Sequence, residues 1–295
     1  MHISSLIKLL RYKQWLKNLF VFVPLFFDRK VLEWSYLWPS VVAFVSFCLV
    51  SSAIYCLNDI HDVDDDRRHP RKCKRPLASG EVSTHAASSI MAVLVILAGA
   101  VSLLAGDGAM GLLAIIGTYF VLNVMYCFWL KSIAIVDVFV ISMGFVLRLL
   151  AGGVASHILV THWVVLMTFL LALFLAFAKR RDDVVIYEST GVLTRKNLDN
   201  YSLPFINQII GLIASMTMVC YVMYTVSPDV VDRFGSRYVY LTSVWVLAAL
   251  IKYLQITIVK NGSGSPTRVL LSNRFLQLCI VCWVLHFALI IYFGI

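Results

Sequence analysis

Long runs of apolar residues alternate with short polar segments along almost the whole chain. A helix needs about 20 residues to cross the hydrocarbon core of a bilayer, so runs of this length predict membrane-spanning helices. The pattern therefore predicts an all-α integral membrane protein in which residues 1–295 form a single membrane domain. We expect nine spans, at residues 18–34, 36–57, 85–106, 109–130, 133–155, 162–178, 204–227, 238–259 and 275–294.

The composition agrees with this pattern. Of the 295 residues, 60% are hydrophobic and 14% are charged, whereas about a quarter of the residues in a typical soluble domain are charged. The N-terminal segment MHISSLIKLLRYKQWLKN is basic and amphipathic but has no small-residue cleavage site, so we expect no cleaved signal peptide. The composition excludes an ordinary soluble protein.

The net charge of +9 is unevenly distributed along the chain. If the N-terminus is cytoplasmic and nine spans alternate, 20 of the 25 Lys and Arg residues lie on the inner side and four on the outer side. Such a bias follows the positive-inside rule. The charge therefore reflects membrane topology, with anionic lipid or a phosphate substrate as a further reason, and we expect no nucleic-acid partner. The predicted location is the cytoplasmic membrane, with the C-terminus outside.

Three polar connections are longer than the others. Residues 58–84 and 179–203 are rich in charge and lie on the predicted inner side, separated by four predicted spans. Residues 260–274, KNGSGSPTRVLLSNR, are rich in Gly, Ser and Pro, which is typical of a flexible connector. We therefore expect function in the first two connections and none in the third.

The first connection begins with the acidic motif NDIHDVDDD. Asn58, Asp62 and Asp66 have the spacing i, i+4, i+8, which places them on one face of a continuing helix. Asp59, Asp64 and Asp65 lie beside them. Like charges on neighbouring turns repel one another unless a cation is bound, and oxygen ligands of this kind suit Mg²⁺. The motif therefore predicts a magnesium site.

Basic residues follow in the segment HPRKCKRPLASG. Lys72, Lys74 and Arg75 can bind phosphate oxygens through charge-assisted hydrogen bonds. Carboxylates for a metal ion beside cations for phosphate predict a diphosphate site. The alternative is a solvated charged loop without a ligand.

The second connection carries Lys179, Arg180 and Asp183 directly after an apolar span. We expect these residues to face the acidic motif and to complete a polar cavity, although basic residues here also anchor a helix at the membrane surface. For Arg195, Lys196 and Tyr201, a substrate role and a structural role are equally supported.

Two ionisable residues lie inside the fifth predicted span. A charged side chain in a membrane is costly, so it indicates either a substrate cavity or a structural pair, and for Arg148 the two are equally supported. Asp137 and Arg148 are 11 residues apart, about three helical turns, so we expect both to face the interior without pairing directly. Near the N-terminus, Lys17 and the neighbouring Asn18 either bind substrate or anchor the first span.

These motifs resemble a known family. NDIHDVDDD matches the Asn-Asp-x-x-Asp-x-x-x-Asp signature of the UbiA superfamily of membrane prenyltransferases, whose fold is a nine-helix bundle. The further motifs RYKQWLKN, HPRKCKRPLASG, KSIAIVDVFVISMGFVLRLLAGG, AKRRDD and RKNLDNYS look like the decaprenyl-phosphate phosphoribosyltransferase branch, over residues 11–202. That branch commonly has Glu where this chain has Asp183. The final third of the chain has no such motif.

The resemblance implies an Mg²⁺-dependent transfer of 5-phosphoribose from phosphoribosyl pyrophosphate to a polyprenyl phosphate, a lipid held between the helices. Asn58, Asp62 and Asp66 would hold the metal ion. The implied catalytic residues are Asp59, Asp62, Asp66, Asp137 and Lys179. The implied substrate-binding residues are Lys17, Lys72, Lys74, Arg75, Arg148, Arg180, Asp183, Arg195 and Tyr201.

Two other functions compete with this one. An ordinary UbiA-type enzyme would move a prenyl group from a prenyl diphosphate to an aromatic acceptor, and the acidic motif alone does not separate the two reactions. A transporter would use Asp137 and Arg148 for ions, but transporters usually place such groups near the membrane midplane at broken helices. Most charge in this chain lies at one membrane face instead, which favours an enzyme.

Overall fold

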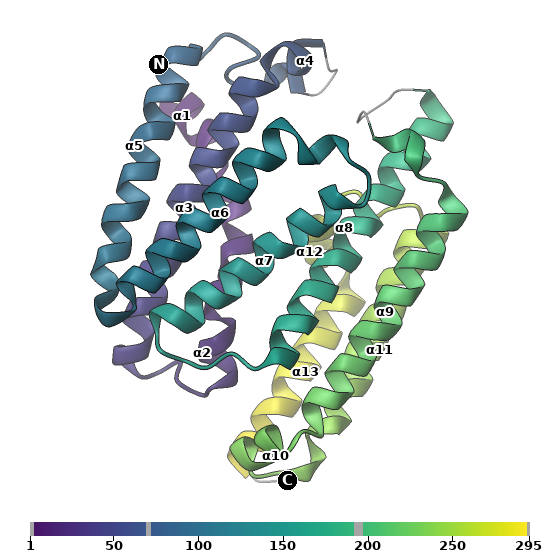
Figure 1. The fold of residues 1–295 in the computed structure, drawn as a ribbon. Coiled ribbons are helices and arrows are strands. Elements are labelled where there is room, and N and C mark those ends of the chain that lie inside the picture. Colours follow the sequence, from purple (N-terminus) through teal and green to yellow (C-terminus); the bar gives the residue numbers. More distant parts are fainter. Residues whose placement is uncertain (1–2, 69–71, 192–196, 294–295) are drawn as a thin grey trace. The chain divides into compact units, whose positions relative to one another are not determined.

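The computed structural model describes residues 3–68, 72–191 and 197–293, and all regular structure in these ranges is helical (Figure 1). The chain divides into two compact units, Met1–Val160 and Thr161–Ile295. Each unit is a set of packed helices joined by short connections. The single membrane domain expected from the sequence stays a prediction.

The first unit is built around the long helix α3. This helix packs against α5, α6, α7 and η1, and the core between them contains Phe47, Val50, Leu112, Leu147 and Ala151. The elements of this unit are α1 (Ile3–Leu10), the 3₁₀-helix η1 (Tyr12–Phe22), α2 (Val23–Phe27), α3 (Trp34–His61), α4 (Val63–Arg68), η2 (Lys72–Lys74), α5 (Thr84–Ser102), η3 (Leu103–Gly108), α6 (Ala109–Phe128), η4 (Leu130–Ser132) and α7 (Val136–Ala155).

Helix α7 approaches η1 very closely. A Cβ atom added to Gly152 would lie 1.8 Å from the carbonyl oxygen of Val21, so only glycine fits at this contact. Small residues let helix backbones meet in this way in membrane proteins, where van der Waals packing replaces much of the hydrophobic driving force. The contact holds the N-terminal segment, with Lys17 and Asn18, against the charged helix α7.

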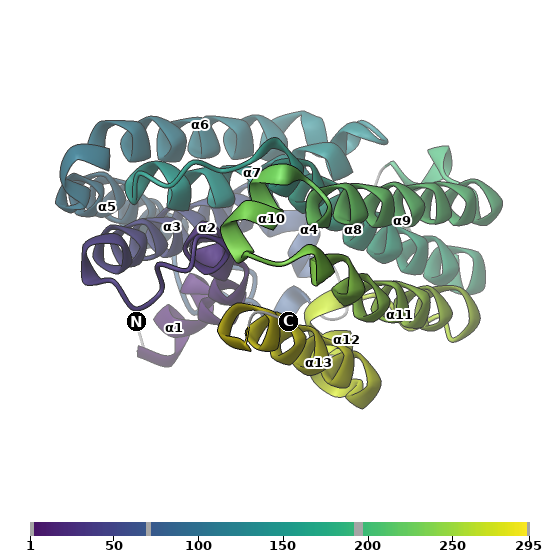
Figure 2. The same ribbon diagram turned by 90° about the horizontal axis from the view of Figure 1, so that it is seen from below.

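The second unit consists mainly of two helix pairs. Helix α8 packs along α9, and α11 packs along α13, as the view in Figure 2 shows. The elements of this unit are α8 (His162–Thr190), η5 (Leu198–Asn200), α9 (Leu203–Thr225), α10 (Pro228–Phe234), η6 (Arg237–Thr242), α11 (Ser243–Leu254), the π-helix η7 (Gln255–Val259), α12 (Pro266–Ser272) and α13 (Arg274–Phe293).

Within the described ranges, six helical stretches are long and apolar enough to cross a membrane, or seven if α12 and α13, which meet at 82°, form one broken span. The nine expected spans are therefore not confirmed. At 18–34 the chain forms η1 and α2 instead of one helix, and Pro24 lies in the first turn of α2, where its missing N–H is tolerated. The expected spans 85–106 and 109–130 fall in one stretch, which bends at Gly106, where φ is 65°.

The charged segment after residue 178 was expected to be a loop, and this was wrong for its first part. Helix α8 continues to Thr190. An ion pair one turn apart, between Arg180 Nη1 and Asp183 Oδ2 at 2.8 Å, stabilises the extension. The helix ends at Gly191, which has a φ of 68°, a left-handed conformation that glycine adopts without strain. The charged residues are therefore held on a rigid element.

Candidate functional site

The acidic motif lies where α3 gives way to α4. Asp62 separates the two helices, but the backbone N–H of Asp62 donates to Asn58 O at 3.0 Å and that of Asp66 donates to Asp62 O at 2.8 Å. These bonds continue the i to i+4 pattern through the junction. Asn58, Asp62 and Asp66 therefore follow one another along a single face, as their spacing predicted.

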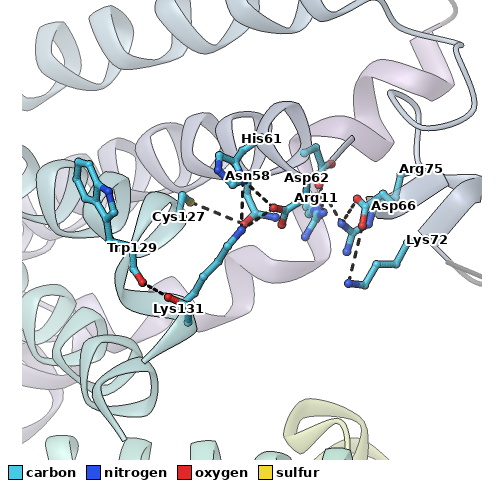
Figure 3. Close-up of polar contacts among 12 residues, drawn as sticks. Arg11, Asn58, His61, Asp62, Asp66, Lys72, Arg75, Cys127, Trp129 and Lys131 are labelled. Atoms are coloured by element: carbon cyan, nitrogen blue, oxygen red, sulfur yellow. Dashed lines mark hydrogen bonds and ion pairs between the residues drawn. The ribbon is translucent and has the colours of Figure 1, made fainter. Parts of the chain in front are cut away.

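Asp59 and Asp66 are buried, each with 2% of its surface exposed, and both are bound by cations. Figure 3 shows Arg75 and Lys72 beside Asp66. Arg75 Nη1 donates to Asp59 Oδ1 at 3.2 Å and to Asp66 Oδ2 at 2.5 Å. Arg11 also binds Asp59, and Lys72 Nζ lies 3.8 Å from Asp66 Oδ1. Buried carboxylates keep their charge only when they are paired in this way, so these five residues form one charged cluster.

Asp62 has separate partners. Lys131 Nζ lies 2.5 Å from Asp62 Oδ1, and His61 Nδ1 lies 2.8 Å from the same oxygen. Burial alone would raise the pKa of Asp62, but hydrogen bonds from Lys131 and then His61 outweigh it and hold the pKa below its usual value. The carboxylate of Asp62 is therefore ionised at neutral pH.

The donor set fits a hard cation in its chemistry. Asn58, Asp62 and Asp66 supply amide and carboxylate oxygens, which Mg²⁺ prefers. The parts of the chain that the structure describes contain no group of three His, Cys, Asp or Glu side chains placed to hold a metal ion. The carboxylates bind arginine and lysine instead, and Asn58 Oδ1 accepts a bond from Cys127 Sγ at 3.7 Å. A bound metal ion would therefore take the place of cations such as Lys131 at these carboxylate oxygens.

Arg11 and Lys131 were missed as site residues by the sequence reasoning. Both were counted among the basic residues of the inner side, and both lie in motifs that identified the branch, RYKQWLKN for Arg11 and KSIAIVDVFVISMGFVLRLLAGG for Lys131. Neither is near the acidic motif in sequence, since Arg11 is 48 residues from Asp59 and Lys131 is 69 residues from Asp62. The packing of η1 and of α6, which precedes η4, beside α3 brings them to the carboxylates.

Arg148 is buried and uses each of its three guanidinium nitrogens. Nε donates to Asn18 Oδ1 at 2.8 Å, Nη1 to Gly144 O at 2.7 Å, and Nη2 to the Tyr119 hydroxyl at 2.9 Å. The guanidinium carbon also lies 4.9 Å from the centre of the Tyr119 ring, an attractive cation–π arrangement. Arg148 therefore ties α7 to η1 and α6 while bringing a positive charge into the interior.

Lys17 lies near two other cations. Burial first, and then the positive charges of Arg148 and Arg11, lower its pKa to about 8. An anionic ligand would stabilise the protonated form of a lysine in this environment, because its negative charge would offset both the cost of burial and the repulsion from the two arginines. The surroundings of Lys17 therefore suit a phosphate group.

The other predicted residues of the first unit lie in different settings. Asp137 is fully buried in the first turn of α7, and its backbone N–H donates to Ile133 O at 3.1 Å. Both Asp137 and Arg148 thus face the interior, as expected. Lys74 is exposed in η2.

In the second unit, Lys179, Arg180 and Asp183 share the polar end of α8. Arg180 is buried, with 2% of its surface exposed, whereas Lys179 is exposed. The Tyr201 ring packs edge-on against Phe177 of the same helix, with the ring centres 6.4 Å apart. Arg195 and Lys196 lie outside the described residues. The cavity that would join this group to the acidic motif stays a prediction.

Comparison with known proteins connects these features to a family. The model of the UbiA prenyltransferase family matches residues 21–279. The decaprenyl-phosphate phosphoribosyltransferase of Mycolicibacterium smegmatis is 33% identical over 303 residues, covering 99% of this chain and 94% of that protein. The protein with the same name from Corynebacterium glutamicum is 32% identical over 297 residues, covering 98% and 87%.

A solved structure agrees at the level of fold. The UbiA homolog from Archaeoglobus fulgidus bound to GPP and Mg²⁺ aligns with a TM-score of 0.70 over 97% of this chain and 99% of that chain, at 16% identity. At this identity the likeness concerns the arrangement of helices.

Proposed function

Because this chain belongs to the UbiA prenyltransferase family, we propose that it transfers 5-phosphoribose from phosphoribosyl pyrophosphate to a polyprenyl phosphate and releases pyrophosphate. The observation that carries the proposal is the similarity to two phosphoribosyltransferases over at least 98% of the chain. Similarity confined to the acidic motif would support membership of the family and no particular substrate. The full-length match makes the protein a transferase of the phosphoribosyl branch.

The charges of the first unit support phosphorylated substrates. Asp59, Asp62 and Asp66 are bound by four cations, Arg11, Lys72, Arg75 and Lys131. Together the substrates carry a 5-phosphate, a diphosphate and a lipid phosphate, which offer many acceptor oxygens. Arginine and lysine bind such oxygens through short, charge-assisted hydrogen bonds. Cations held in place by carboxylates are suited to binding several phosphates at once.

The chemistry requires no proton acceptor for the nucleophile. An oxygen of the lipid phosphate forms a bond to C1 of the ribose, the bond from C1 to the diphosphate oxygen breaks, and the electron pair leaves with pyrophosphate. Positive charge develops on the ribose ring and negative charge on the leaving group. Preorganised cations that stabilise such charge typically contribute several kcal/mol, about 3 per group.

We assign Asn58, Asp62 and Asp66 as the residues that hold a Mg²⁺ ion, with Asp59 positioning the cations beside them. A bound Mg²⁺ neutralises diphosphate oxygens and orients the leaving group. The hard oxygen donors support this assignment, as does the presence of Mg²⁺ in the Archaeoglobus fulgidus homolog. The remaining residues that we assign to substrate or catalysis are Lys17, Lys72, Lys74, Arg75, Asp137, Arg148, Lys179, Arg180, Asp183 and Tyr201.

The protein is an integral membrane protein, and we propose that it lies in the cytoplasmic membrane with its N-terminus inside. Phosphoribosyl pyrophosphate is a charged, water-soluble donor, so its site must face the compartment that makes it. The basic connections on the predicted inner side agree with this orientation. An odd number of crossings would place the C-terminus outside.

The second candidate is prenyl transfer to an aromatic acceptor. It is favoured by the ligand GPP in the Archaeoglobus fulgidus homolog, which is a prenyl diphosphate. The lower identity of that protein, 16% against 33% for the phosphoribosyltransferase from Mycolicibacterium smegmatis, makes this the weaker proposal.

One assay separates the two reactions. Purified protein in detergent is given phosphoribosyl pyrophosphate labelled in the ribose, a polyprenyl phosphate and Mg²⁺, and label in the lipid extract is counted. We expect transfer that requires the lipid phosphate and is abolished by a chelator. A parallel reaction contains a prenyl diphosphate and an aromatic acid.

Absence of ribose transfer together with prenylation of the aromatic acid would overturn the phosphoribosyl proposal. Ribose transfer that persists in excess chelator would instead remove the magnesium assignment and leave the reaction intact.

A further inference from the structure

Arg181 is buried in the second unit and binds four acceptors, although its sequence pattern predicted no role for it. Its Nε donates to Asn207 Oδ1 at 2.7 Å, and Nη1 donates to Asn261 Oδ1 at 2.7 Å. It also donates to two backbone carbonyls, those of Thr257 at 2.7 Å and Ile258 at 3.3 Å. Only 5% of its surface is exposed, so its guanidinium is committed to the protein.

The two carbonyls belong to the end of the π-helix η7. The last carbonyls of a helix have no partner within the helix, and a cation there is favourable. Arg181 supplies the donors that these carbonyls lack. It thus joins three segments that are far apart in the sequence, namely α8, α9 and the end of η7.

The chain after η7 is also attached to α8. Asn261 has a φ of 48°, a left-handed conformation that Asn tolerates better than most residues. Ser263 is fully buried, and its hydroxyl donates to the carbonyl oxygen of Ala178 at 2.7 Å. The Asp182 carboxylate lies close to the backbone of Gly264. The segment that was expected to be a flexible connector is therefore fixed at its start, and that expectation was wrong.

Gly264 lies so close to Asp182 that a side chain at residue 264 would fit only if the Asp182 carboxylate moved. A Cβ atom added to Gly264 would lie 2.2 Å from Asp182 Oδ2, well inside contact distance. A Cβ atom added to Gly262, two residues earlier, would meet its nearest neighbour at 3.8 Å, which is an ordinary contact. The sequence Asn-Gly-Ser-Gly thus contains one glycine where a methyl group would displace Asp182 and one where a methyl group would find space.

The motif AKRRDD divides into two interleaved sets. Ala178, Arg181 and Asp182 have the spacing i, i+3, i+4, and all three contact the segment after η7. Lys179, Arg180 and Asp183 belong to the other set, which we assigned to substrate and which contains the Arg180–Asp183 ion pair. Consecutive residues therefore serve different tasks.

We propose that the Arg181 network, consisting of Arg181, Asp182, Asn207, Asn261, Ser263 and Gly264, positions Lys179, Arg180 and Asp183 for the transfer reaction. Arg181 and Asp182 are positioning residues that do not touch phosphate. The substrate part of this inference rests on the proposed function. A displacement of about 1 Å in groups that act on the reacting centre can lower the rate about 100-fold, so an anchored helix end is a functional requirement.

The first test compares Gly264→Ala with Gly262→Ala, a matched control in the same segment. The added methyl group of Gly264→Ala displaces Asp182, whereas that of Gly262→Ala finds space. We expect Gly264→Ala to lower kcat at least about 10-fold while KM for both substrates changes less than about 3-fold. Gly262→Ala should match the wild type. Equal kcat for the two variants would overturn the proposal.

The second test distinguishes geometry from charge at Arg181. Lysine keeps the positive charge but cannot reproduce the planar fork that binds four acceptors. We therefore expect Arg181→Lys and Arg181→Gln to lose kcat to the same extent. A phosphate-binding Arg181 would behave differently, because the lysine variant would keep most of the activity and the glutamine variant would raise KM. That result would contradict a positioning role.

The third measurement does not depend on the reaction. Lys260 is exposed beside the anchored segment, and trypsin cleaves after lysine when the backbone can open. In the full-length protein in detergent, we expect slow cleavage at Lys260 in the wild type and Gly262→Ala, and faster cleavage in Arg181→Gln and Gly264→Ala. Equal cleavage rates in all four proteins would contradict the proposal that the Arg181 network holds the segment after η7 in place.

The kinetic comparisons use whichever of the two transfer reactions the wild-type protein performs. If ribose transfer fails but the cleavage pattern and the kcat pattern hold with a prenyl diphosphate, the positioning role stands and the phosphoribosyl proposal falls. If ribose transfer occurs and the variants match the wild type, the positioning role alone falls.

Discussion

Arg75 connects the two buried carboxylates of the first unit through a single nitrogen atom. Its Nη1 contacts both Asp59 and Asp66, which have further partners in Arg11 and Lys72 respectively. The side chain of Arg75 is 26% exposed, whereas those of the two carboxylates are 2% and 3% exposed. Arg75 is thus the cation that links both carboxylates while remaining accessible to a ligand.

We expect Arg75→Ala to lower the transfer rate about 100-fold, because it removes one preorganised cation from the proposed diphosphate site. Each carboxylate keeps one other cation, so the protein should still fold. The matched control is Arg67→Ala, which breaks an exposed pair with Asp64 at 3.0 Å that contributes at most about 1 kcal/mol. Label transfer measured for both variants checks this, and a rate for Arg75→Ala within threefold of wild type would contradict it.

Lys17 predicts a pH dependence. Its pKa is lowered to about 8, so the free protein loses this positive charge as the pH rises through 8. If Lys17 binds a substrate phosphate, kcat/KM should fall above that pH. Lys17→Arg keeps its charge at high pH and should shift the fall upward, whereas Lys17→Met should remove it along with much of the activity. An unchanged profile in Lys17→Arg would exclude the role.

A rise in pH should increase the contribution of Lys17 to stability, although it should lower the activity. Because the folded pKa lies below the ordinary value of 10.5, the unfolded chain binds more protons between pH 8 and 10.5. The contribution of Lys17 to stability should therefore rise over this interval. Thermal unfolding of Lys17→Met in detergent should lack that part of the rise.

At the scale of elements, close helix packing decides where the charged side chains lie. Gly152 lets α7 touch η1 at Val21, and the same pair of elements carries the bond from Arg148 to Asn18. A wider separation of the elements would lengthen this bond. The charged residues of the interior thus depend on a glycine that has no chemistry of its own.

We expect Gly152→Ala to destabilise the protein by about 1–3 kcal/mol, because overpacking at a tight contact forces the backbones apart. Gly117→Ala is the matched control, since a Cβ atom there meets nothing within 4 Å, and alanine in an open helical position stabilises by up to about 1 kcal/mol. Thermal unfolding of the two variants in the same detergent checks the difference. A Gly152→Ala protein as stable as the control would show that α7 and η1 can separate without cost.

At the scale of the whole molecule, the distribution of charge predicts the orientation in the membrane. Most Lys and Arg residues belong to the segments predicted to lie inside, including residues 58–84 and 179–203. Membrane insertion retains basic segments on the cytoplasmic side. Phosphate binding and retention on the cytoplasmic side therefore both require these segments to be basic.

Labelling of single cysteines tests the orientation. Ser79 and Asp229 are exposed and lie in segments predicted to be on opposite sides. In a chain without its natural cysteines, a membrane-impermeant maleimide added to intact cells should label Asp229→Cys and leave Ser79→Cys unlabelled. Permeabilised cells should show labelling of both. The reverse pattern in intact cells would invert the topology and place the proposed donor site outside.

The sequence by itself determined the membrane class, the polar face of Asn58, Asp62 and Asp66, and the family. These depend on local patterns, namely apolar length, helical spacing and short motifs. Tertiary structure decided the partners, because Arg11 and Lys131 reach the carboxylates only through the packing of distant elements. It also gave Arg181 its role, since the four acceptors of its guanidinium lie 26 to 80 residues away. Spacing along one helix predicts which side chains share a face, but only the packing of other elements determines what that face contacts.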